Sequence, residues 1–372
     1  MNFDLSEEQR MLCETARKFF AREFPLARLR ELESRGWDAF MPVYRKMGEI
    51  GYLGIAVPEQ AGGSGGTWID LALFAEEAGR ALVPTLQITS VVLSGQAVLA
   101  LGNEAQRARL PALLTGEAVI APAWIEATEA SREPPAVRMA TRGEAIELNG
   151  AKRYVEGYAP ASELLVSARD PADAVRFVLV SRQAAGIETE EVQLTSLDRV
   201  HHLRFAQVPV APDCVMPADW NAWLRIIDAA KIVAAAWSIG AARAALEMAV
   251  AYAKDRKQFG RPIGSFQAVQ HRLADAAIVL EQASAMVRYA AWLCSSQGSC
   301  PREAAMAKLV AGRAVRLVTH AATLTHGGYG FMEEFDIQLY FRRAKQFEHL
   351  VEGPVLQREL IAADSEDLLR AR

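Results

Sequence analysis

The chain has few cysteines and no long run of basic residues, and each shortage excludes a class of protein. Its 372 residues include only four cysteines, with neither a CxxC pair nor histidines at metal-ligand spacing. A disulfide framework and a structural metal site are therefore not expected. The formal net charge is −4, and Lys and Arg are dispersed. This balance argues against a nucleic-acid or anionic-membrane partner.

Long apolar runs and a targeting segment are also missing. No apolar run approaches the roughly 20 residues needed to span a bilayer. The N-terminus begins with acidic, amphipathic sequence instead of a basic region followed by an apolar one. This start is not that of a secretory signal. We therefore expect no membrane span and a cytoplasmic protein.

Hydrophobic residues are plentiful, at 51% of the chain. A chain of this length suits two or three domains of roughly 100–200 residues each. Helical patterns dominate as far as about residue 116, after a capping-box pair at Ser6 and Gln9. The Gly- and Pro-containing segment 58–66 interrupts them and predicts a loop. We therefore expect a helical domain over residues 1–116.

The middle of the chain changes to short runs rich in Val, Ile and Leu, which predict a β domain over residues 117–216. Asn149-Gly150 is its strongest hairpin signal, because a type I′ turn needs two residues that tolerate positive φ. From residue 217 to 372 long amphipathic helices return and indicate a four-helix bundle. Pro301 stands where one of these helices can begin.

Five segments are informative together. The string RKQFGRPIGSFQ spans residues 256–267, and HGGYGF spans 326–331. FDLSEEQRMLCETARKF, GYLGIAVPEQAGGSGG and LNGAKRYVEG precede them in the chain. These segments resemble segments of the acyl-CoA dehydrogenase family, occur in the same order, and together span nearly the whole chain from its start to its end. The resemblance implies an α+β multidomain protein with the acyl-CoA dehydrogenase fold: N-terminal helical domain, central β domain and C-terminal four-helix bundle.

The resemblance also implies FAD as the cofactor. An arginine at the position of Arg256 reaches the FAD pyrophosphate in the family, and Gln258 and Phe259 border the cofactor across a subunit interface. A guanidinium is a planar fork of donors that fits phosphate oxygens. Arg256 could instead only cap a helix C-terminus. A dimer or tetramer, homomeric or heteromeric, is implied together with the flavin.

Gly327 and Gly328 correspond to glycines that approach the adenine and pyrophosphate part of FAD in the family. Glycine permits such a close approach because it has no side chain. A helix C-cap alone would explain one glycine well, and two less well. The family usually has a glutamine three residues before the first of these glycines, and this chain has Leu324.

The middle segment departs further from the family. Where typical members have tryptophan, an aliphatic residue and threonine against the flavin ring, this chain has Tyr154, Val155 and Glu156. The strand before it, which commonly contacts the flavin, contains Trp124 and Ile125. Trp124 could stack on the flavin or lie in the core, and the residues leave both interpretations open.

The reaction implied is α,β-dehydrogenation of an acyl-CoA thioester, in which a carboxylate removes the α-proton and the β-hydrogen leaves as hydride to flavin N5. Glu352, followed by Gly353, resembles the family's glutamate-glycine pair and is the candidate base. An ungapped comparison places Val351 at that position instead. Some members carry the base on an earlier helix, where this chain has Ala230.

Several functions therefore remain open. The chain is a complete dehydrogenase that passes electrons to an electron-transfer flavoprotein, or it is a subunit without a base that completes the FAD pocket of another polypeptide. Heteromeric family members of the second kind act on bulky acyl groups such as those of steroids. A flavin oxidase or monooxygenase on the same fold is a further alternative, because fold does not fix reaction. A non-enzymatic acyl-CoA-binding role is the last.

Overall fold

A computed structural model of the chain describes residues 4–126, 132–142, 145–217 and 219–370. The chain packs as two compact units. Unit 1 contains Met1–Arg30, Trp68–Val83 and Lys231–Arg372, and unit 2 contains Glu31–Thr67 and Pro84–Ala230. Each unit combines stretches that are distant in the sequence. The domain boundaries predicted at residues 116 and 216 stay a prediction.

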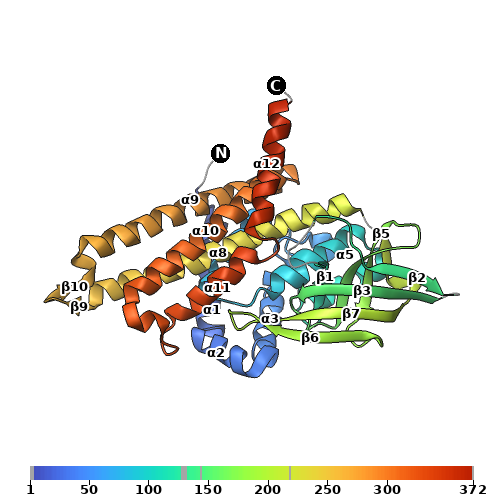
Figure 1. Ribbon diagram of the computed structural model, residues 1–372, viewed down its shortest axis with the longest axis horizontal. Helices are drawn as coiled ribbons and strands as arrows, with labels where there is room; N and C mark the ends of the chain where they lie inside the picture. Colours follow the sequence, from blue (N-terminus) through green and yellow to red (C-terminus); the bar gives the residue numbers. More distant parts are fainter. Residues whose placement is uncertain (1–3, 127–131, 143–144, 218, 371–372) are drawn as a thin grey trace. The chain divides into compact units, whose positions relative to one another are not determined.

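Unit 1 is built from helices. α1 begins after Ser6, whose side chain accepts a hydrogen bond from Gln9 N–H while the Gln9 side chain accepts from Ser6 N–H. The predicted capping box is therefore confirmed. α10 packs against α9, α11 and α12. Figure 1 shows α9 and α10 side by side, whereas α12 crosses them and projects from the bundle. The helices are α1 (Glu7–Glu23), α4 (Trp68–Arg80), the part of α8 (Trp220–Asp255) from Lys231 onward, α9 (Gln267–Gln297), α10 (Pro301–His326), the 3₁₀ turn η7 (Gly327–Phe331), α11 (Ile337–His349) and α12 (Pro354–Arg370).

α8 is long and apolar. By length and composition alone it is apolar enough to cross a membrane. However, 78% of its most apolar window is buried inside the structure. A core helix of a folded domain has this property, because it is covered by protein on all sides.

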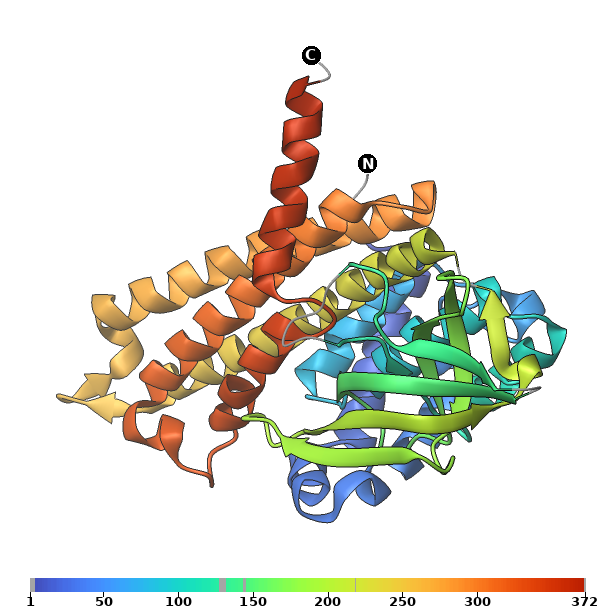
Figure 2. The same ribbon diagram turned by 45° about the vertical axis from the view of Figure 1, so that its right-hand side comes forward.

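A short hairpin joins α8 to α9. Strands β9 (Lys257–Gln258) and β10 (Arg261–Pro262) pair antiparallel, and the 3₁₀ turn η6 (Ile263–Ser265) follows. The two residues of the turn, Phe259 and Gly260, have φ of +54° and +79°. Positive φ at both central positions is the property of a type I′ turn. Figure 2 shows this hairpin at one end of the helical bundle.

Unit 2 combines short helices with a sheet. Part of α2 (Leu26–Arg35) belongs to it, together with α3 (Met41–Glu49), α5 (Gln96–Leu101), α6 (Glu104–Arg107) and α7 (Leu110–Leu114). Residues 87–95 form a π-helix, η4, which is buried throughout. The 3₁₀ turns are η1 (Gly36–Ala39), η2 (Tyr52–Gly54), η3 (Glu59–Ala61) and η5 (Pro212–Cys214). The predicted loop over residues 58–66 thus contains one short 3₁₀ turn.

The sheet of unit 2 has the strand order β6-β7-β3-β2-β4-β5-β8, and β1 pairs with β4 in parallel. β4 and β5 have few exposed positions, because both of their faces are covered over most of their length. The strands are β1 (Ile120–Ala123), β2 (Arg138–Arg142), β3 (Ala145–Val155), β4 (Glu163–Arg169), β5 (Val175–Ser181), β6 (Ile187–Gln193), β7 (Arg199–Val210) and β8 (Val215–Pro217).

The hairpin predicted at Asn149-Gly150 is wrong. Both residues lie inside β3, where the register against β7 shifts between Leu148 and Gly150. Gly150 has φ of +137°, and the Asn149 carboxamide oxygen accepts a hydrogen bond from Gln207 N–H at 3.0 Å. Ala206 and Gln207 of β7 lie opposite Asn149 alone, so the bulge is in β7 and β3 continues through the pair. β3 pairs with β2 on one side and with β7 on the other, and this pairing keeps the strand continuous. A local turn signal contains no information about such pairing.

Candidate functional site

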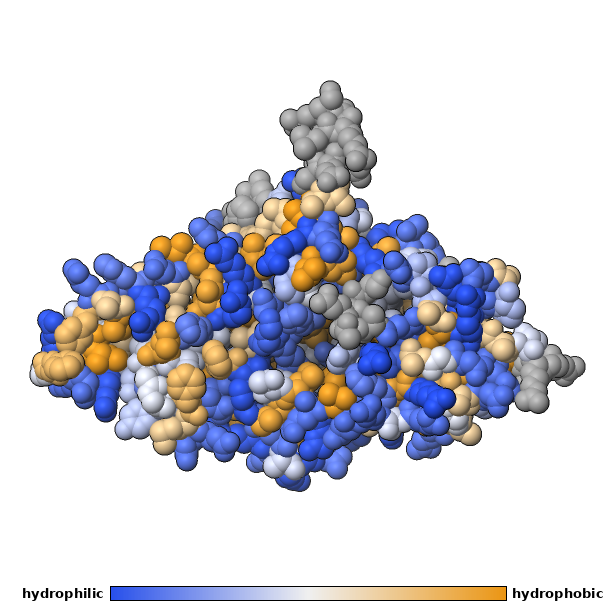
Figure 3. All heavy atoms as spheres, viewed as in Figure 1, coloured by the Kyte–Doolittle hydropathy of each residue, from blue (hydrophilic) through white to orange (hydrophobic). Residues whose placement is uncertain are grey.

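A cavity of about 550 Å³ lies in unit 1 where α8, the β9–β10 hairpin and the end of α10 meet. It brings together residues that the sequence analysis took from two separate motifs. Figure 3 shows apolar residues among polar ones at this end of the bundle. The residues that line the cavity include Tyr252, Arg256, Gln258, His326, Gly327 and Gly328.

Backbone hydrogen bonds hold Arg256 in place, while its side chain is exposed. Its N–H donates to Tyr252 C=O at 2.9 Å, and its C=O accepts from Ile263 N–H at 2.8 Å. Its guanidinium carbon lies 5.7 Å from the centre of the Tyr329 ring, within the range of a cation–π contact. The helix end thus fixes where the cation stands, while its donors face solvent and remain open to an anionic ligand.

The glycines of HGGYGF are glycines for different reasons. Gly327 has φ of +62°, so its backbone conformation favours glycine. A Cβ at Gly330 would lie 2.4 Å from Thr323 C=O, so packing requires that glycine. Neither reason applies to Gly328, where a Cβ would meet nothing within 4 Å and φ is not positive. Its small size leaves the cavity wall open to a ligand.

His326 and Tyr252 also line this cavity. His326 begins the HGGYGF motif but had no predicted role, and Tyr252 was not predicted at all. Their rings stack with centroids 4.3 Å apart, and His326 Nδ1 lies 2.8 Å from Ala322 C=O. In the neutral ring, Nδ1–H then donates to that carbonyl. Tyr252 precedes Arg256 by four residues, so helical periodicity alone could have placed it on the same face.

Gln258 and Phe259 belong to the hairpin at the cavity's edge. Gln258 lines the cavity, and its side-chain amide donates to Lys257 C=O at 2.8 Å. Phe259 is 93% exposed and stands edge-on to Phe266 at 6.1 Å. A phenylalanine that combines positive φ with nearly full exposure is costly for an isolated chain. Contact with another molecule would explain it.

Glu352 lies in a buried polar cluster of unit 1. Its carboxylate is 3.3 Å from Lys231 Nζ, and both side chains are 0% exposed. Gln357 donates from Nε2 to Glu352 at 3.1 Å and accepts from Lys231 at 3.3 Å. The three side chains therefore satisfy one another in the core. Lys231 and Gln357 were not predicted, because nothing in their sequence surroundings marks them.

Val351, the residue before Glu352, has a strained backbone. Its φ is +71°, and Glu352 N–H donates to Leu350 C=O across it at 3.0 Å. A hydrogen bond between residues two apart with positive φ between them defines the rarer, strained form of the γ-turn. For a β-branched residue this conformation is an outlier that the surrounding structure must hold.

The alternative position for a base, Ala230, is fully buried in unit 2. The nearest carboxylate along α8 belongs to Asp228, which is 4% exposed and forms an ion pair with Arg132. Arg132 C=O also accepts from the Trp220 indole N–H at 2.9 Å. Asp228 is thus neutralised in the core of its unit, as Glu352 is in the core of the other.

Trp124 and Ile125 follow β1 in unit 2. Trp124 is 8% exposed and packs edge-to-face on Trp223, with centroids 5.9 Å apart. Ile125 is half-buried, and its C=O accepts from Arg153 N–H at 2.7 Å. Trp124 therefore belongs to an aromatic core cluster, whereas the Ile125 backbone ties the strand to β3.

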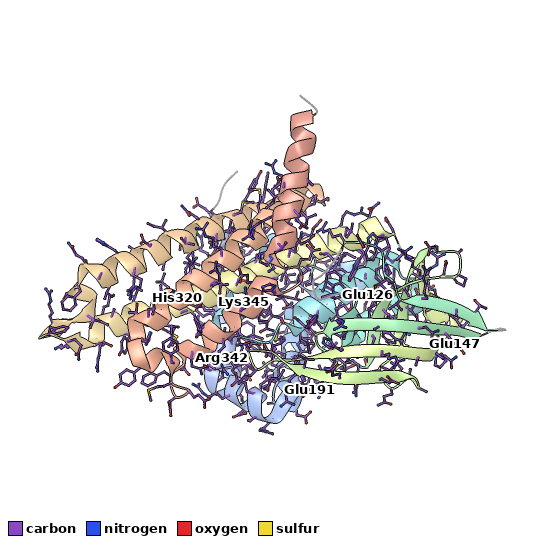
Figure 4. All side chains as sticks on the ribbon, viewed as in Figure 1. Glu126, Glu147, Glu191, His320, Arg342 and Lys345 are labelled. Carbon is purple, nitrogen blue, oxygen red and sulfur yellow. The ribbon has the colours of Figure 1, made fainter. Side chains whose placement is uncertain are left out.

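Glu126 follows directly, and Figure 4 shows it beside the sheet. Its carboxylate accepts from Val137 N–H at 3.0 Å and from Lys152 Nζ at 2.5 Å. Lys152 is fully buried, and burial lowers its pKa to about 8, against the opposing effect of Glu126. This pair anchors β3 two residues before Tyr154.

Tyr154 itself has φ of +52°. Its N–H donates to His202 Nδ1 at 3.2 Å, and its ring stands edge-on to the His202 ring at 4.8 Å. Glu156, two residues later, accepts from Thr85 Oγ1 at 3.5 Å. A carboxylate therefore stands where the resemblance places a hydroxyl near the flavin.

Comparison of the sequence with known protein families identifies the family of this chain. Residues 6–117 match the model of the acyl-CoA dehydrogenase N-terminal domain, and residues 220–364 match that of the C-terminal domain. The two matches cover well over half of the chain. This chain belongs to the acyl-CoA dehydrogenase family. Among the described residues, no group of three or more His, Cys, Asp or Glu side chains could hold a metal ion.

Individual relatives of this family member cover the chain almost completely. It is 33% identical to a probable acyl-CoA dehydrogenase, YngJ, of Bacillus subtilis over 97% of this chain and 99% of that protein. The Tcur3481-Tcur3483 steroid ACAD, as a G363A variant, is 30% identical with a TM-score of 0.86 over 97% and 99% of the two chains. The ChsE4-ChsE5 complex of Mycobacterium tuberculosis is 26% identical with a TM-score of 0.87 over 98% and 99%.

The predicted fold class is confirmed: an N-terminal helical domain, a central β sheet and a C-terminal helical domain. The cavity of unit 1 fits the adenine and pyrophosphate part of FAD in its chemistry. Arg256 supplies a cation, and Gly328 leaves a wall into which phosphate oxygens can come close. The roles of these residues, and those of Gln258, Phe259, Trp124, Ile125, Tyr154 and Gly327, stay predictions.

Proposed function

We propose that this protein is an FAD-binding subunit of an oxidoreductase that removes the α-proton and the β-hydrogen of an acyl-CoA thioester. FAD is the family's cofactor, and when bound it supplies the acceptor for the β-hydrogen. Arg256 would bind the pyrophosphate, with Gln258 and Gly328 at its sides. Electrons would then pass to an electron-transfer flavoprotein.

The Lys231–Glu352 pair carries the proposal about the base. A general base must reach its proton at hydrogen-bond distance in a substrate complex. Glu352 is instead 0% exposed and bound to Lys231 and Gln357. If it took up a proton, the Lys231 ammonium would stay buried without its counter-charge, which is costly. We therefore propose that another chain of a heteromeric assembly supplies the base.

The names of two relatives support an assembly in which one chain binds FAD and another supplies the base. Two of the solved structures bear the names of two proteins each, Tcur3481-Tcur3483 and ChsE4-ChsE5. Exposed Phe259 at the edge of the cavity is also suited to contact with a second chain. The names of other relatives give short-chain acyl and glutaryl groups, so the proposal extends to acyl-CoA thioesters as a class and to no single acyl group.

The second candidate function is a self-sufficient dehydrogenase in which Glu352 is the base. The strained backbone of Val351 favours it, because a γ-turn with positive φ can relax to another conformation when its surroundings change. In that case substrate binding would break the Lys231–Glu352 pair and turn the carboxylate toward the substrate.

One experiment separates the two candidates. The protein purified alone is loaded with FAD, its visible spectrum is recorded, and a panel of acyl-CoA thioesters is added without oxygen. We expect flavin absorption that no thioester bleaches. Bleaching by any thioester, lost in Glu352→Gln while flavin binding persists, would establish Glu352 as the base and overturn the proposal of a missing base.

Two controls complete the experiment. Dithionite must bleach the same sample, which shows that the bound flavin can be reduced. Arg256→Gln should lower the affinity for FAD at least tenfold, because it removes the cation and one arm of the donor fork. If Arg256→Gln binds FAD as tightly as the wild type, the proposed pocket is wrong. Rapid oxygen consumption with a thioester and no other acceptor would instead identify an oxidase or monooxygenase.

A further inference from the structure

Tyr154, near the end of β3, and Tyr158, in the turn after it, face two consecutive histidines of β7. Tyr154 stands edge-on to His202 with centroids 4.8 Å apart, and Tyr158 packs on His201 at 4.6 Å. β3 and β7 pair antiparallel, with a register shift between Lys152 and Val155. The histidines thus lie against residues 154–157, where β3 ends and a turn begins, and which are called the flavin-facing turn below because the family resemblance places them beside the flavin ring.

Tyr154 needs such a partner because its conformation is unfavourable. A left-handed backbone costs a non-glycine residue about 1–2 kcal/mol. The register shift also removes the Tyr154 N–H from the regular ladder between β3 and β7. His202 Nδ1 accepts that N–H at 3.2 Å, and its ring braces the phenol. His202 therefore compensates both the backbone strain of Tyr154 and the hydrogen bond that its N–H lacks in the ladder between β3 and β7.

The bond fixes the tautomer of the neutral His202 ring. Nδ1 can accept a hydrogen bond only without a proton, so the neutral ring carries its proton on Nε2. A second proton would turn Nδ1 into a donor that faces the Tyr154 N–H donor. The contact would then become repulsive, and the turn would lose its support.

We propose that His202 is a positioning residue for the flavin-facing turn of residues 154–157, and that its protonation releases this turn. The inference rests on the proposed function for the flavin, but not on the identity of the base. Glu156 would move with the turn, because it lies two residues after Tyr154 and is bound to Thr85. Acidification would therefore change the surroundings of the flavin ring.

The charged neighbours of His202 come from three strands. His202 pairs in register with Glu190 of β6 and lines a cavity of about 310 Å³. Its neighbour His201 has Glu191 at 3.8 Å, and Figure 4 shows Glu191 on β6. Burial lowers the pKa of His201, so its ring becomes protonated only at a lower pH. The other charged residues that line the cavity are Glu188 on β6, Lys152 and Arg153 on β3, and Arg204 on β7.

The first test needs no flavin. Amide hydrogen exchange of residues 152–158 is followed by mass spectrometry from pH 5 to pH 8, with each rate divided by its intrinsic value. We expect protection of Tyr154 N–H at pH 8, lost on acidification. His202→Ala should exchange about fivefold faster at pH 8, the worth of one hydrogen bond. Unchanged exchange in His202→Ala would overturn the proposal.

Two variants serve as controls. His202→Asn keeps an acceptor, because the carboxamide oxygen can replace Nδ1, but it cannot titrate. It should restore protection and abolish the pH dependence, which a merely structural role would not predict. His320→Asn, an exposed histidine on α10 of unit 1 that Figure 4 labels, should leave the exchange profile unchanged.

The second test uses the FAD-loaded protein. Visible circular dichroism of the bound flavin should change with pH in the wild type and stay constant in His202→Asn. A wild type that binds no FAD would defeat the proposed function and leave the exchange result standing. If exchange responds to His202 but flavin dichroism does not, the turn does not face the flavin and this inference fails while the proposed function stands.

Discussion

Individual buried charges in this protein are compensated in different ways. Lys308 donates to the C=O groups of Phe347 and Glu348, both at 2.9 Å, and so caps the end of α11. Lys231 faces the Glu352 carboxylate, and Lys152 faces that of Glu126. Neutral carbonyl groups thus compensate Lys308, whereas a carboxylate compensates each of the other two lysines. The response of the protein to pH should differ accordingly.

Lys152 gives a stability that rises with pH. Its pKa falls from the ordinary lysine value of 10.5 to about 8 in the folded protein. Between these values the unfolded chain binds the proton and the folded chain does not, so the free energy of unfolding increases with pH. Urea unfolding at pH 7.5 and 10 should show wild type gaining roughly 1–3 kcal/mol relative to Lys152→Met. A difference that does not change with pH would contradict the prediction.

That comparison also removes opposing contributions. Burial raises the pKa of the Cys13 thiol to about 11, so this group lowers stability as pH rises through the alkaline range. Both proteins contain Cys13, and its contribution cancels in their difference.

Gly328 and Gly330 provide a matched pair at the residue scale. Gly330→Ala should lower the free energy of unfolding by about 1–3 kcal/mol, because the new Cβ meets Thr323 C=O. Gly328→Ala should change it by less than about 0.5 kcal/mol. FAD titration followed by flavin fluorescence should show at least tenfold weaker binding in Gly328→Ala. Unchanged affinity in that variant would remove Gly328 from the cofactor site.

At the scale of elements, the Lys231–Glu352 pair joins α8 to the junction between α11 and α12. Lys231→Met should cost about 3–5 kcal/mol, because it leaves a buried carboxylate without its counter-charge. The double variant Lys231→Met with Glu352→Met should cost less than the sum of the single variants. Urea unfolding of all four proteins measures this coupling, and additive costs would contradict it.

A second double-mutant cycle is the control for this coupling. Lys152→Met combined with Glu352→Met pairs residues of different units, each of which has its own partner. Their costs should add within about 0.5 kcal/mol. Additivity there with coupling in the first cycle would assign the effect to the ion pair.

At the scale of the whole molecule, we predict association through the end of the bundle that carries β9–β10. Phe259 is 93% and Phe331 is 68% exposed there. Phe259→Asp should weaken association, because it places a charge in a contact that needs apolar surface. Aspartate tolerates positive φ, so the turn itself should survive. Light scattering after size exclusion measures the oligomer, and an unchanged oligomer would exclude this surface.

Ile50→Asp is the matched control for that variant. Ile50 is 52% exposed and lies in unit 2, outside the hairpin and the cavity. The same change of charge there should leave the oligomer intact. Loss of association in both variants would indicate a general effect of charge instead of a specific contact.

Features that depend on neighbours in sequence were predictable from sequence. The capping box at Ser6 and the start of α10 at Pro301 depend on a few consecutive residues, and both are as predicted. The turn rule failed where sheet pairing competed with it. The type I′ geometry expected at Asn149-Gly150 occurs at Phe259-Gly260 instead. No local propensity favours phenylalanine at positive φ, so the surrounding hairpin must hold it there.

The amino-acid sequence by itself determined the family, the fold class and the two motifs that form the cavity of unit 1, because short-range patterns and motif order carry that information. Tertiary structure decided the state of Glu352. Its partner Lys231 lies far away in the chain, and only folding brings the two charges within 3.3 Å in the core. The same holds for His202 and Tyr154, which strand pairing brings together. Electrostatic and hydrogen-bond contacts depend on distance in space, and sequence spacing does not give that distance.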